Sequence, residues 1–439
     1  MNRNSEYEAM IQELSQPAPA LETTLDRAYK KRRKRTTQMV FRPMTGLAAC
    51  FLVFVLLVNF SSPVAYACSL VPGLRELAEA VTFSRSLSDA VENEYVQPIA
   101  LSQTEHGITA EIVHLIVDQK QVNIFYRLNS DQYQQLCADP DIECEDETIG
   151  FCVGNNSFGQ ENGALLSITV DFTQDDVPDH LNCKLHVYSN ADPVSDEPDY
   201  LADFNFLLEF DPKFTAAGKV FPVNQTVTLD GQAITVTNIE VYPTHLRVEI
   251  AESAENTAWM KNLDFYIETD GGMKFEPVSN GISATGSVDS PSMVSYRADS
   301  TYFYDAEHLK LVITGAKWLR KDMNTTYLNL VTGECGALPE GVVFDSATKE
   351  DSGWVVTFRA ARQEDQPMYQ LFENPFYDAD GNEYEIHQWS TFGDPDSEGS
   401  TTYFYEEFPL PQFTGEEVWL SPYYSHTWVA DDLIVITIQ

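Results

Sequence analysis

Short motifs that mark common catalytic and metal-binding sites are missing from the sequence. Its 439 residues contain no C-x-x-C, H-E-x-x-H or G-x-S-x-G pattern, no P-loop and no dinucleotide-binding fingerprint. The eight histidines are scattered along the chain. The two catalytic carboxylates of glycosidases meet in space and need not be close in sequence. Among 67 acidic residues, a pair chosen from the sequence alone is therefore no evidence for such a site. We therefore expect no enzymatic activity, no metal ion and no cofactor.

Basic residues are also scarce. The chain has 27 Lys and Arg against 67 Asp and Glu, a net charge of −40, which excludes a general nucleic-acid binder because phosphate contacts need a basic surface. Hydrophobic residues still make up 43% of the chain and aromatic residues 12%, enough for packed cores. At about 100 to 200 residues per domain, this length predicts two to four domains.

Charge is absent altogether between Arg42 and Arg75. Residues 1–43 carry nine basic and five acidic side chains, a net of +4, so the remainder of the chain has a net charge of −44. The uncharged stretch 44–62 has 19 mostly apolar residues. At about 1.5 Å per residue, a helix of this length spans the roughly 30 Å hydrocarbon core, so we expect one transmembrane helix here.

The basic cluster 30–35 predicts how that helix is oriented. Lys and Arg gather on the cytoplasmic side of membrane helices, so we expect a single-pass protein of the cell membrane with its N-terminus in the cytoplasm and its C-terminal region outside. Two alternatives stay open. Ala65 to Ala67 resembles a signal-peptidase site, although a charged leader of 43 residues is long for a signal peptide. Cys68 could carry a lipid, but Ala65 and Tyr66 fit a lipid-attachment box poorly.

The cytoplasmic segment, residues 1–43, is too short to bury a core of its own. Its apolar residues recur at helical spacing on both sides of Pro17 and Pro19, which predicts two short amphipathic helices. One interpretation is that a partner protein covers them; the other is that they are marginal helices leading into the charge cluster. If a partner binds, its expected contact residues are Ile11, Leu14, Leu25 and Tyr29.

Four cysteines fall in one stretch on the expected oxidising side of the membrane. Their spacing favours two local disulfides, Cys137 with Cys144 and Cys152 with Cys183. Four cysteines allow three connectivities. A zinc site is the weaker alternative, since His180 and His186 are the only nearby imidazoles. The disulfide candidates are Cys137, Cys144, Cys152 and Cys183.

Beyond the membrane segment a helical stretch gives way to alternating apolar and polar residues, the pattern of half-buried strands. Three hairpins are predicted, with second strands around Ile124, Val248 and Val356. The sequence Thr301 to Asp305 recurs as Thr402 to Glu406, an offset of 101 residues, which is the size of an immunoglobulin-like sandwich.

We therefore expect a mainly β protein with about three immunoglobulin-like β-sandwich units after a single transmembrane helix and a short helical cytoplasmic segment. The expected boundaries are 63–215 for a first unit with a helical entry, 216–320 for the second and 321–439 for the third. Two acidic stretches, 139–147 and 378–383, invite a calcium-site interpretation. Neither has the spacing of a calcium loop, and solvated loops or a hairpin turn explain them better.

Several short motifs, taken in their order, resemble a known family. Val71-Pro72-Gly73-Leu74, Glu94-Tyr95-Val96-Gln97 and Gly107-Ile108-Thr109 are similar to a family of Gram-positive bacterial membrane proteins catalogued as a domain of unknown function. The similarity covers roughly residues 45 to 215. The segment from Val223 to Pro243 resembles the immunoglobulin-like domain that often follows it.

This resemblance implies membrane-tethered regulation. Such proteins are commonly encoded beside an extracytoplasmic-function sigma factor and are taken as its anti-sigma partner. This sequence lacks the zinc-binding H-x-x-x-C-x-x-C motif of better-understood anti-sigma factors, since no Cys or His precedes Cys50. Sigma-factor binding would then rest on the two short helices, and the outer region would sense an unknown extracytoplasmic ligand. The alternative is a structural or adhesive cell-surface β protein without a signalling role.

Overall fold

The computed structural model describes residues 10–11, 74–156, 161–189, 199–215, 217–278, 282–287, 290–304, 306, 308–350, 353–361, 370–386, 389–393 and 403–438. The expected transmembrane helix, residues 44–62, lies outside these ranges. Among the helices within them, none is both long and apolar enough to cross a bilayer. The described part of the chain is mainly β, as the alternating pattern predicts.

Two short helices precede the strands. They are α4 (Leu74–Ala80) and α5 (Arg85–Glu92). Ser84 caps α5, because its side chain accepts a hydrogen bond from the backbone N–H of Leu87 at 3.3 Å. One face of α5 is apolar and buries Leu87, Ala90 and Val91.

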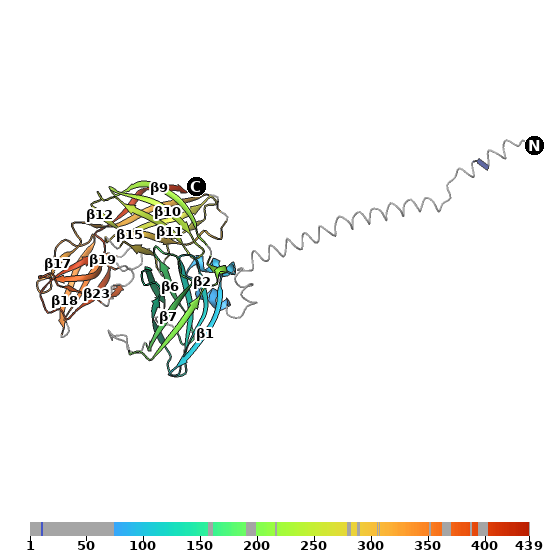
Figure 1. Ribbon diagram of the computed structural model, residues 1–439. Coiled ribbons are helices and arrows are strands. Elements are labelled where there is room, and N and C mark those ends of the chain that lie inside the picture. Colours follow the sequence, from blue (N-terminus) through green and yellow to red (C-terminus); the bar gives the residue numbers. More distant parts are fainter. Residues whose placement is uncertain are drawn as a thin grey trace, which may run out of the picture. The chain divides into compact units, whose positions relative to one another are not determined.

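The first β unit consists of a five-stranded and a three-stranded antiparallel sheet around one hydrophobic core (Figure 1). The sheet orders are β1-β2-β3-β6-β5 and β4-β7-β8. Alternate side chains of β7 and β8 are buried, which is why these strands show a period of two. The strands are β1 (Gln97–Glu105), β2 (Ile108–Val117), β3 (Gln121–Ser130), β4 (Leu136–Glu143), β5 (Phe151–Asn156), β6 (Leu165–Phe172), β7 (His180–Ser189) and β8 (Ala202–Glu209).

The second β unit follows a single 3₁₀ turn, η1 (Pro212–Phe214). Its two sheets have the orders β14-β15-β11-β10-β9 and β13-β12-β16-β25, and they enclose a second core around Trp318. The strands are β9 (Lys219–Leu229), β10 (Gln232–Val241), β11 (Leu246–Glu252), β12 (Ala258–Thr269), β13 (Lys274–Phe275), β14 (Ala284–Gly286), β15 (Met293–Ala298), β16 (Leu309–Arg320) and β25 (His426–Ile438).

The third β unit has two four-stranded sheets, with the orders β17-β24-β20-β21 and β18-β19-β23-β22. The aromatic rings of Phe358, Phe372 and Phe408 pack against one another in its core. The strands are β17 (Thr326–Asn329), β18 (Val342–Glu350), β19 (Gly353–Ala361), β20 (Phe372–Asp378), β21 (Glu383–Tyr384), β22 (Ser390–Gly393), β23 (Tyr403–Pro411) and β24 (Glu417–Pro422).

The three predicted hairpins are confirmed as β2–β3, β10–β11 and β18–β19. The hairpin turn expected at residues 378–383 also lies between two paired strands, β20 and β21. These features depend on strand alternation and turn chemistry within a few residues, and both are visible locally.

The last strand belongs to the second unit, although the sequence analysis assigned residues 321–439 to the third. β25 pairs antiparallel with β16, and Ile436 and Ile438 are buried in the second core. In Figure 1 the C-terminal end accordingly lies beside β9. Gly315 permits this pairing, because a Cβ atom there would lie 2.8 Å from the carbonyl oxygen of Trp428. The third unit is therefore an insertion between two neighbouring strands of the second.

The aromatic repeat is not a structural repeat. Tyr302 to Tyr304 form a turn between β15 and β16, whereas Tyr403 to Tyr405 lie in strand β23. The repeat-based expectation was wrong at this point, because a run of three aromatic residues fits either a strand or a packed turn, and the surrounding fold decides between them.

Candidate functional site

The expected partner-binding residues lie almost wholly outside the described residues. Leu14, Leu25 and Tyr29 are not described, and Ile11 belongs to a helical pair, residues 10–11, with 52% of its surface exposed. Their role in binding a partner therefore stays a prediction.

Neither of the two disulfides favoured by the cysteine spacing is present. Cys144, Cys152 and Cys183 are free thiols. Cys137 on β4 lies opposite Tyr188 on β7 and Cys183 lies opposite Ile142, whereas Cys152 is in the other sheet of that unit. The expected partners are kept apart because the extended strand β4 separates Cys137 from Cys144, and because Cys152 and Cys183 lie in different sheets. Burial raises the pKa of Cys183 to about 12, so its thiol stays protonated at neutral pH.

A buried cluster of charged side chains joins the first and second β units. Asp171 on β6 receives two hydrogen bonds from the guanidinium of Arg297 on β15, at 2.7 and 3.0 Å, and one from Arg247 on β11 at 3.1 Å. Arg247 also donates to the backbone carbonyl of Phe172 at 2.9 Å. All three charged side chains are at most 1% exposed. Ion pairs this deeply buried are directional and require their partners.

A chain of hydrogen bonds extends the cluster to a second carboxylate, Asp118, in the turn after β2. Arg247 donates its Nε–H to Nε2 of His245 at 2.8 Å, and Nδ1 of His245 lies 2.8 Å from the hydroxyl of Thr244. Thr244 donates that hydroxyl to Asp118 at 2.6 Å. Because Nε2 accepts and the threonine hydroxyl donates onward, the proton of His245 resides on Nδ1.

The cluster is balanced in charge. Burial, together with the neighbouring Arg247 and Arg297, holds the pKa of His245 well below its ordinary value of 6.5, so this imidazole is neutral. Two arginines then face two aspartates. Burial raises the pKa of Asp118, and hydrogen bonds from Thr244 and backbone N–H groups oppose that effect.

Helix α5 docks on the second β unit through Arg85. The guanidinium of Arg85 lies 4.2 Å from the ring centre of Phe275 and 4.9 Å from that of Tyr304, and it donates to the backbone carbonyl of Lys274 at 3.1 Å. Planar stacking on two aromatic rings is a geometry that arginine adopts and lysine does not. The helix is thus held by a residue specific for this site.

Hydrogen bonds of Ser86 and Asp89, on the same helix, complete the docking. Ser86 donates its backbone N–H and its hydroxyl to Asp299 at 3.2 and 3.0 Å, and its oxygen accepts the backbone N–H of Ser300 at 2.7 Å. Tyr304 donates its hydroxyl to Asp89 at 3.1 Å. Tyr304 belongs to the aromatic motif that begins at Thr301. The motif is visible in the sequence, but its role in docking α5 is not.

In the buried cluster around Asp171 and in the docking contacts of α5, the polar groups described above bond to one another. Both regions therefore hold parts of the protein together rather than offer free groups to a ligand. Within the described ranges, no group of three or more His, Cys, Asp or Glu side chains is placed to hold a metal ion. The sequence did not indicate the buried cluster, because its hydrogen-bonded pairs Asp171 with Arg297 and Asp118 with Thr244 are each 126 residues apart.

Comparisons with known families give two partial matches. Residues 37–130 match a domain of unknown function (DUF4179), and residues 218–339 match a family of unknown function (DUF5643). The first match begins before the expected membrane helix and ends at β3. The second covers β9 to β17. Both regions are thus similar to families whose function is not established.

Among curated proteins, none matches the chain. Among solved structures, a conserved domain protein from Bacillus anthracis is similar at 15% identity and a TM-score of 0.42, over 55% of this chain and 84% of that one. The Escherichia coli adhesin FdeC is similar at 12% identity and a TM-score of 0.16, over 77% of this chain and 98% of that one. Neither comparison assigns a function to this chain.

Proposed function

We propose that this chain is a single-pass membrane regulator whose three immunoglobulin-like β units sense a condition outside the cell and whose cytoplasmic segment acts as an anti-sigma-like negative effector. The match over residues 37–130 supports this proposal, because one recognised region includes both the expected membrane helix and the first strands. The basic cluster before the membrane helix supports the orientation.

The docking of α5 is the observation on which the proposal rests. This helix lies between the expected membrane segment and the first strand, yet its polar contacts through Arg85, Ser86 and Asp89 are with the second unit. A rearrangement of the second unit would therefore act directly on the segment closest to the membrane. A protein that only displays β units at the cell surface has no need of such a contact.

The experiment is a crosslinked pull-down of the full-length protein from its native cell, with a reporter of sigma-factor target genes. A Leu14→Glu, Leu25→Glu double variant places charges on the apolar stripes. The matched control, Gln12→Glu with Thr23→Glu, places the same charges beside the stripes. We expect the wild type and the control to recover a sigma factor and the double variant to lose it. Recovery of envelope components alone would contradict the proposal and favour the adhesive alternative.

A second arm of the same experiment tests coupling through α5. Arg85→Gln removes the stacked guanidinium, whereas Arg320→Gln alters an exposed arginine paired locally with Asp322. We expect faster backbone amide exchange over residues 85–92 and a changed reporter level with Arg85→Gln only. A faster exchange with an unchanged reporter would show that the docking has no part in signalling.

A further inference from the structure

A wide groove lies at one end of the first β unit, where its two sheets are joined by loops. It has a volume of about 970 Å³ and is lined by the end of β3, the β3–β4 loop, the residues before β6 and the end of β7. None of the lining residues is basic, and nearly all are polar. Loops at the end of a β-sandwich are a common place for binding sites, because the sheets hold the loops rigidly.

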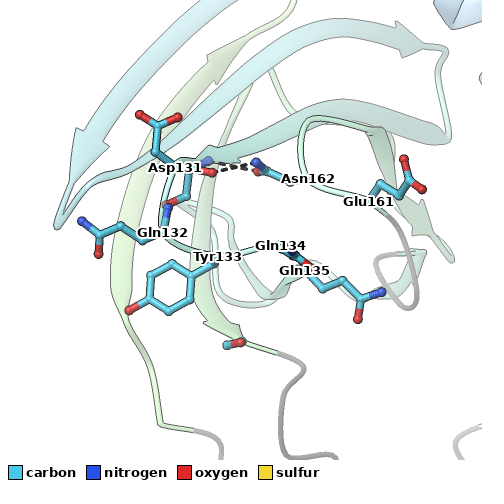
Figure 2. A pocket seen from close by; sticks show the side chains of 9 residues that line it. Asp131, Gln132, Tyr133, Gln134, Gln135, Glu161 and Asn162 are labelled. Atoms are coloured by element: carbon cyan, nitrogen blue, oxygen red, sulfur yellow. Dashed lines mark hydrogen bonds between the residues drawn. The ribbon is translucent and has the colours of Figure 1, made fainter.

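The floor of this groove is fixed by hydrogen bonds within the protein. Asn162 accepts the backbone N–H of Ser130 at 3.0 Å and donates its amide to the carbonyl of Ser130 at 2.7 Å (Figure 2). The hydroxyl of Ser130 accepts the backbone N–H of Gln132 at 3.1 Å, and the backbone N–H of Asn162 donates to the carbonyl of Gln134 at 3.1 Å. The loop backbone is therefore already ordered before any ligand arrives.

The side chains above this floor have no hydrogen-bond partner in the described part of the chain. These are three primary amides and two carboxylates, carried by Gln132, Gln134, Gln135, Asp131 and Glu161. Figure 2 shows Gln132 on one side of the loop and Gln135 and Glu161 on the other. Each amide offers a donor and an acceptor side by side, and each carboxylate offers two acceptors.

Tyr133 provides an aromatic surface among these polar groups. The ring is half-buried and packs against the core of the first unit, so its position is fixed while one part stays accessible. A pyranose ring has an apolar face of C–H bonds and a rim of neighbouring hydroxyl groups. An aromatic ring matches the face, and adjacent amides and carboxylates match the rim.

We propose that this groove binds an oligosaccharide that is neutral or carries amino groups. The two carboxylates and the absence of basic side chains along the lining disfavour anionic polymers. The proposed function leaves the sensed ligand open, and this inference names its chemical class. It rests on the proposed function in one respect, the location of the first β unit outside the cell.

Two other grooves lack this combination. One, of about 630 Å³, is lined by Glu145, Asp146 and Glu147 without an aromatic side chain. The other, of about 430 Å³ in the third unit, contains Tyr384, but Asp378 beside it already accepts four hydrogen bonds, from two backbone N–H groups of its own turn, the Asn382 amide and the Tyr384 hydroxyl. Of these three grooves, the one in the first unit combines the largest volume with three primary amides and two carboxylates beside a tyrosine ring.

The test measures binding of defined probes to the full-length protein in detergent by saturation-transfer NMR and calorimetry. The probes are tetra-N-acetylchitotetraose, its de-acetylated tetramer, cellotetraose and, as a cationic peptide, tetralysine. The test variant is Gln132→Ala with Gln135→Ala, whose side chains are exposed. The matched control, Gln174→Ala with Gln225→Ala, removes two exposed amides elsewhere. A Tyr133→Ala variant is added, with its thermal unfolding measured in parallel.

We expect at least one oligosaccharide to bind, with a tenfold or greater rise in Kd in the test variant and no change in the control. The inference is overturned if no oligosaccharide binds, if binding survives the test variant, or if only tetralysine binds in a groove-dependent way. Failure here is distinct from failure of the proposed function. A groove that binds sugar in a protein that recovers no sigma factor would keep this inference and remove the regulatory one.

Discussion

The second β unit is joined to its two neighbours in different ways. The chain passes once from the first unit to the second, between β8 and β9, and the contact is reinforced by the buried cluster around Asp171. The chain passes twice between the second and third units, because the third is inserted between β16 and β25. Among the described residues, the contact there includes an ion pair between buried Lys261 and the partly exposed Glu373, at 3.1 Å.

The difference shows two means of fixing one domain against another. Where one covalent connection is present, directional bonds between buried charges set the arrangement, and each bond depends on the others. Where two connections are present, chain continuity limits the arrangement and a single ion pair suffices. We therefore expect the first junction to be far more sensitive to substitution than the second.

The largest expected effect comes from Asp171→Ala. It leaves Arg247 and Arg297 buried without their shared counter-charge, which costs about 3–5 kcal/mol of the free energy of unfolding. Denaturant unfolding of the purified protein measures this loss, and amide exchange over β6 and β15 localises it. Asp203→Ala, which removes an exposed carboxylate paired with His186, is the control and changes stability by less than about 0.5 kcal/mol. Equal effects of the two variants would contradict the comparison.

A pH titration separates the junction from the third unit. Burial raises the pKa of Glu406 on β23 to about 7, although it accepts backbone N–H groups of Leu371 and Phe372 at 2.7 and 3.1 Å. The stability that protonated Glu406 provides is therefore complete below its ordinary pKa of 4.5 and is lost as the pH rises through about 7. The loss reaches about 3 kcal/mol at most. The third unit thus weakens as the pH rises from about 4.5 to about 7, and this contribution stays constant above that.

The first junction responds in the opposite direction. Because the pKa of His245 lies well below 6.5 in the folded protein, the unfolded chain binds the extra proton first, and stability falls as the pH drops below about 6.5. Unfolding curves between pH 4.5 and 9, with amide exchange to assign each transition, test both directions. Glu406→Gln should remove the loss of stability of the third unit between about pH 4.5 and pH 7 and leave the acid loss at the first junction. If the third unit of the variant still loses stability over that range, the loss belongs to another group.

The smallest expected effect comes from Lys261→Met at the second junction. Its partner Glu373 has 31% of its side chain exposed and can be solvated once the lysine is gone. The expected loss is about 1 kcal/mol, measured by denaturant unfolding. Lys310→Met, at a more exposed pair with Glu268, is the control and should be nearly neutral. A loss as large as that of Asp171→Ala would show that the two junctions do not differ in this way.

Local features of this fold could be predicted from the sequence, and long-range ones could not. The hairpin of β10 and β11 follows from alternating residues and a short turn. The partner of β25 does not follow, because an alternating strand near Ile436 fits any sheet with an open edge. The contact of Asp171 with Arg297 spans 126 residues, and nothing in either strand marks its charged residue as buried. Charged residues in strands are usually exposed, so their burial is visible only in three dimensions.

The groove of the first unit illustrates the same limit. Its three glutamines lie within the four residues 132–135 and have the pattern of an ordinary polar loop. Only the packing of Tyr133 against the core and the bonds between Ser130 and Asn162 distinguish them from other exposed loops. Sequence patterns record which residues are polar, whereas a binding site depends on which polar groups remain without partners.

The insertion of the third unit also determines the order in which the units of the nascent chain can fold. As the protein is synthesised from its N-terminal end, β16 emerges about a hundred residues before β25, with the whole third unit between them. Until β25 arrives, the edge of β16 has no partner on that side, and Leu311 and Ile313 lack part of their cover. The third unit can fold early, while the second must wait. A pause in synthesis after β16 would therefore prolong the period in which this edge is open to wrong pairing.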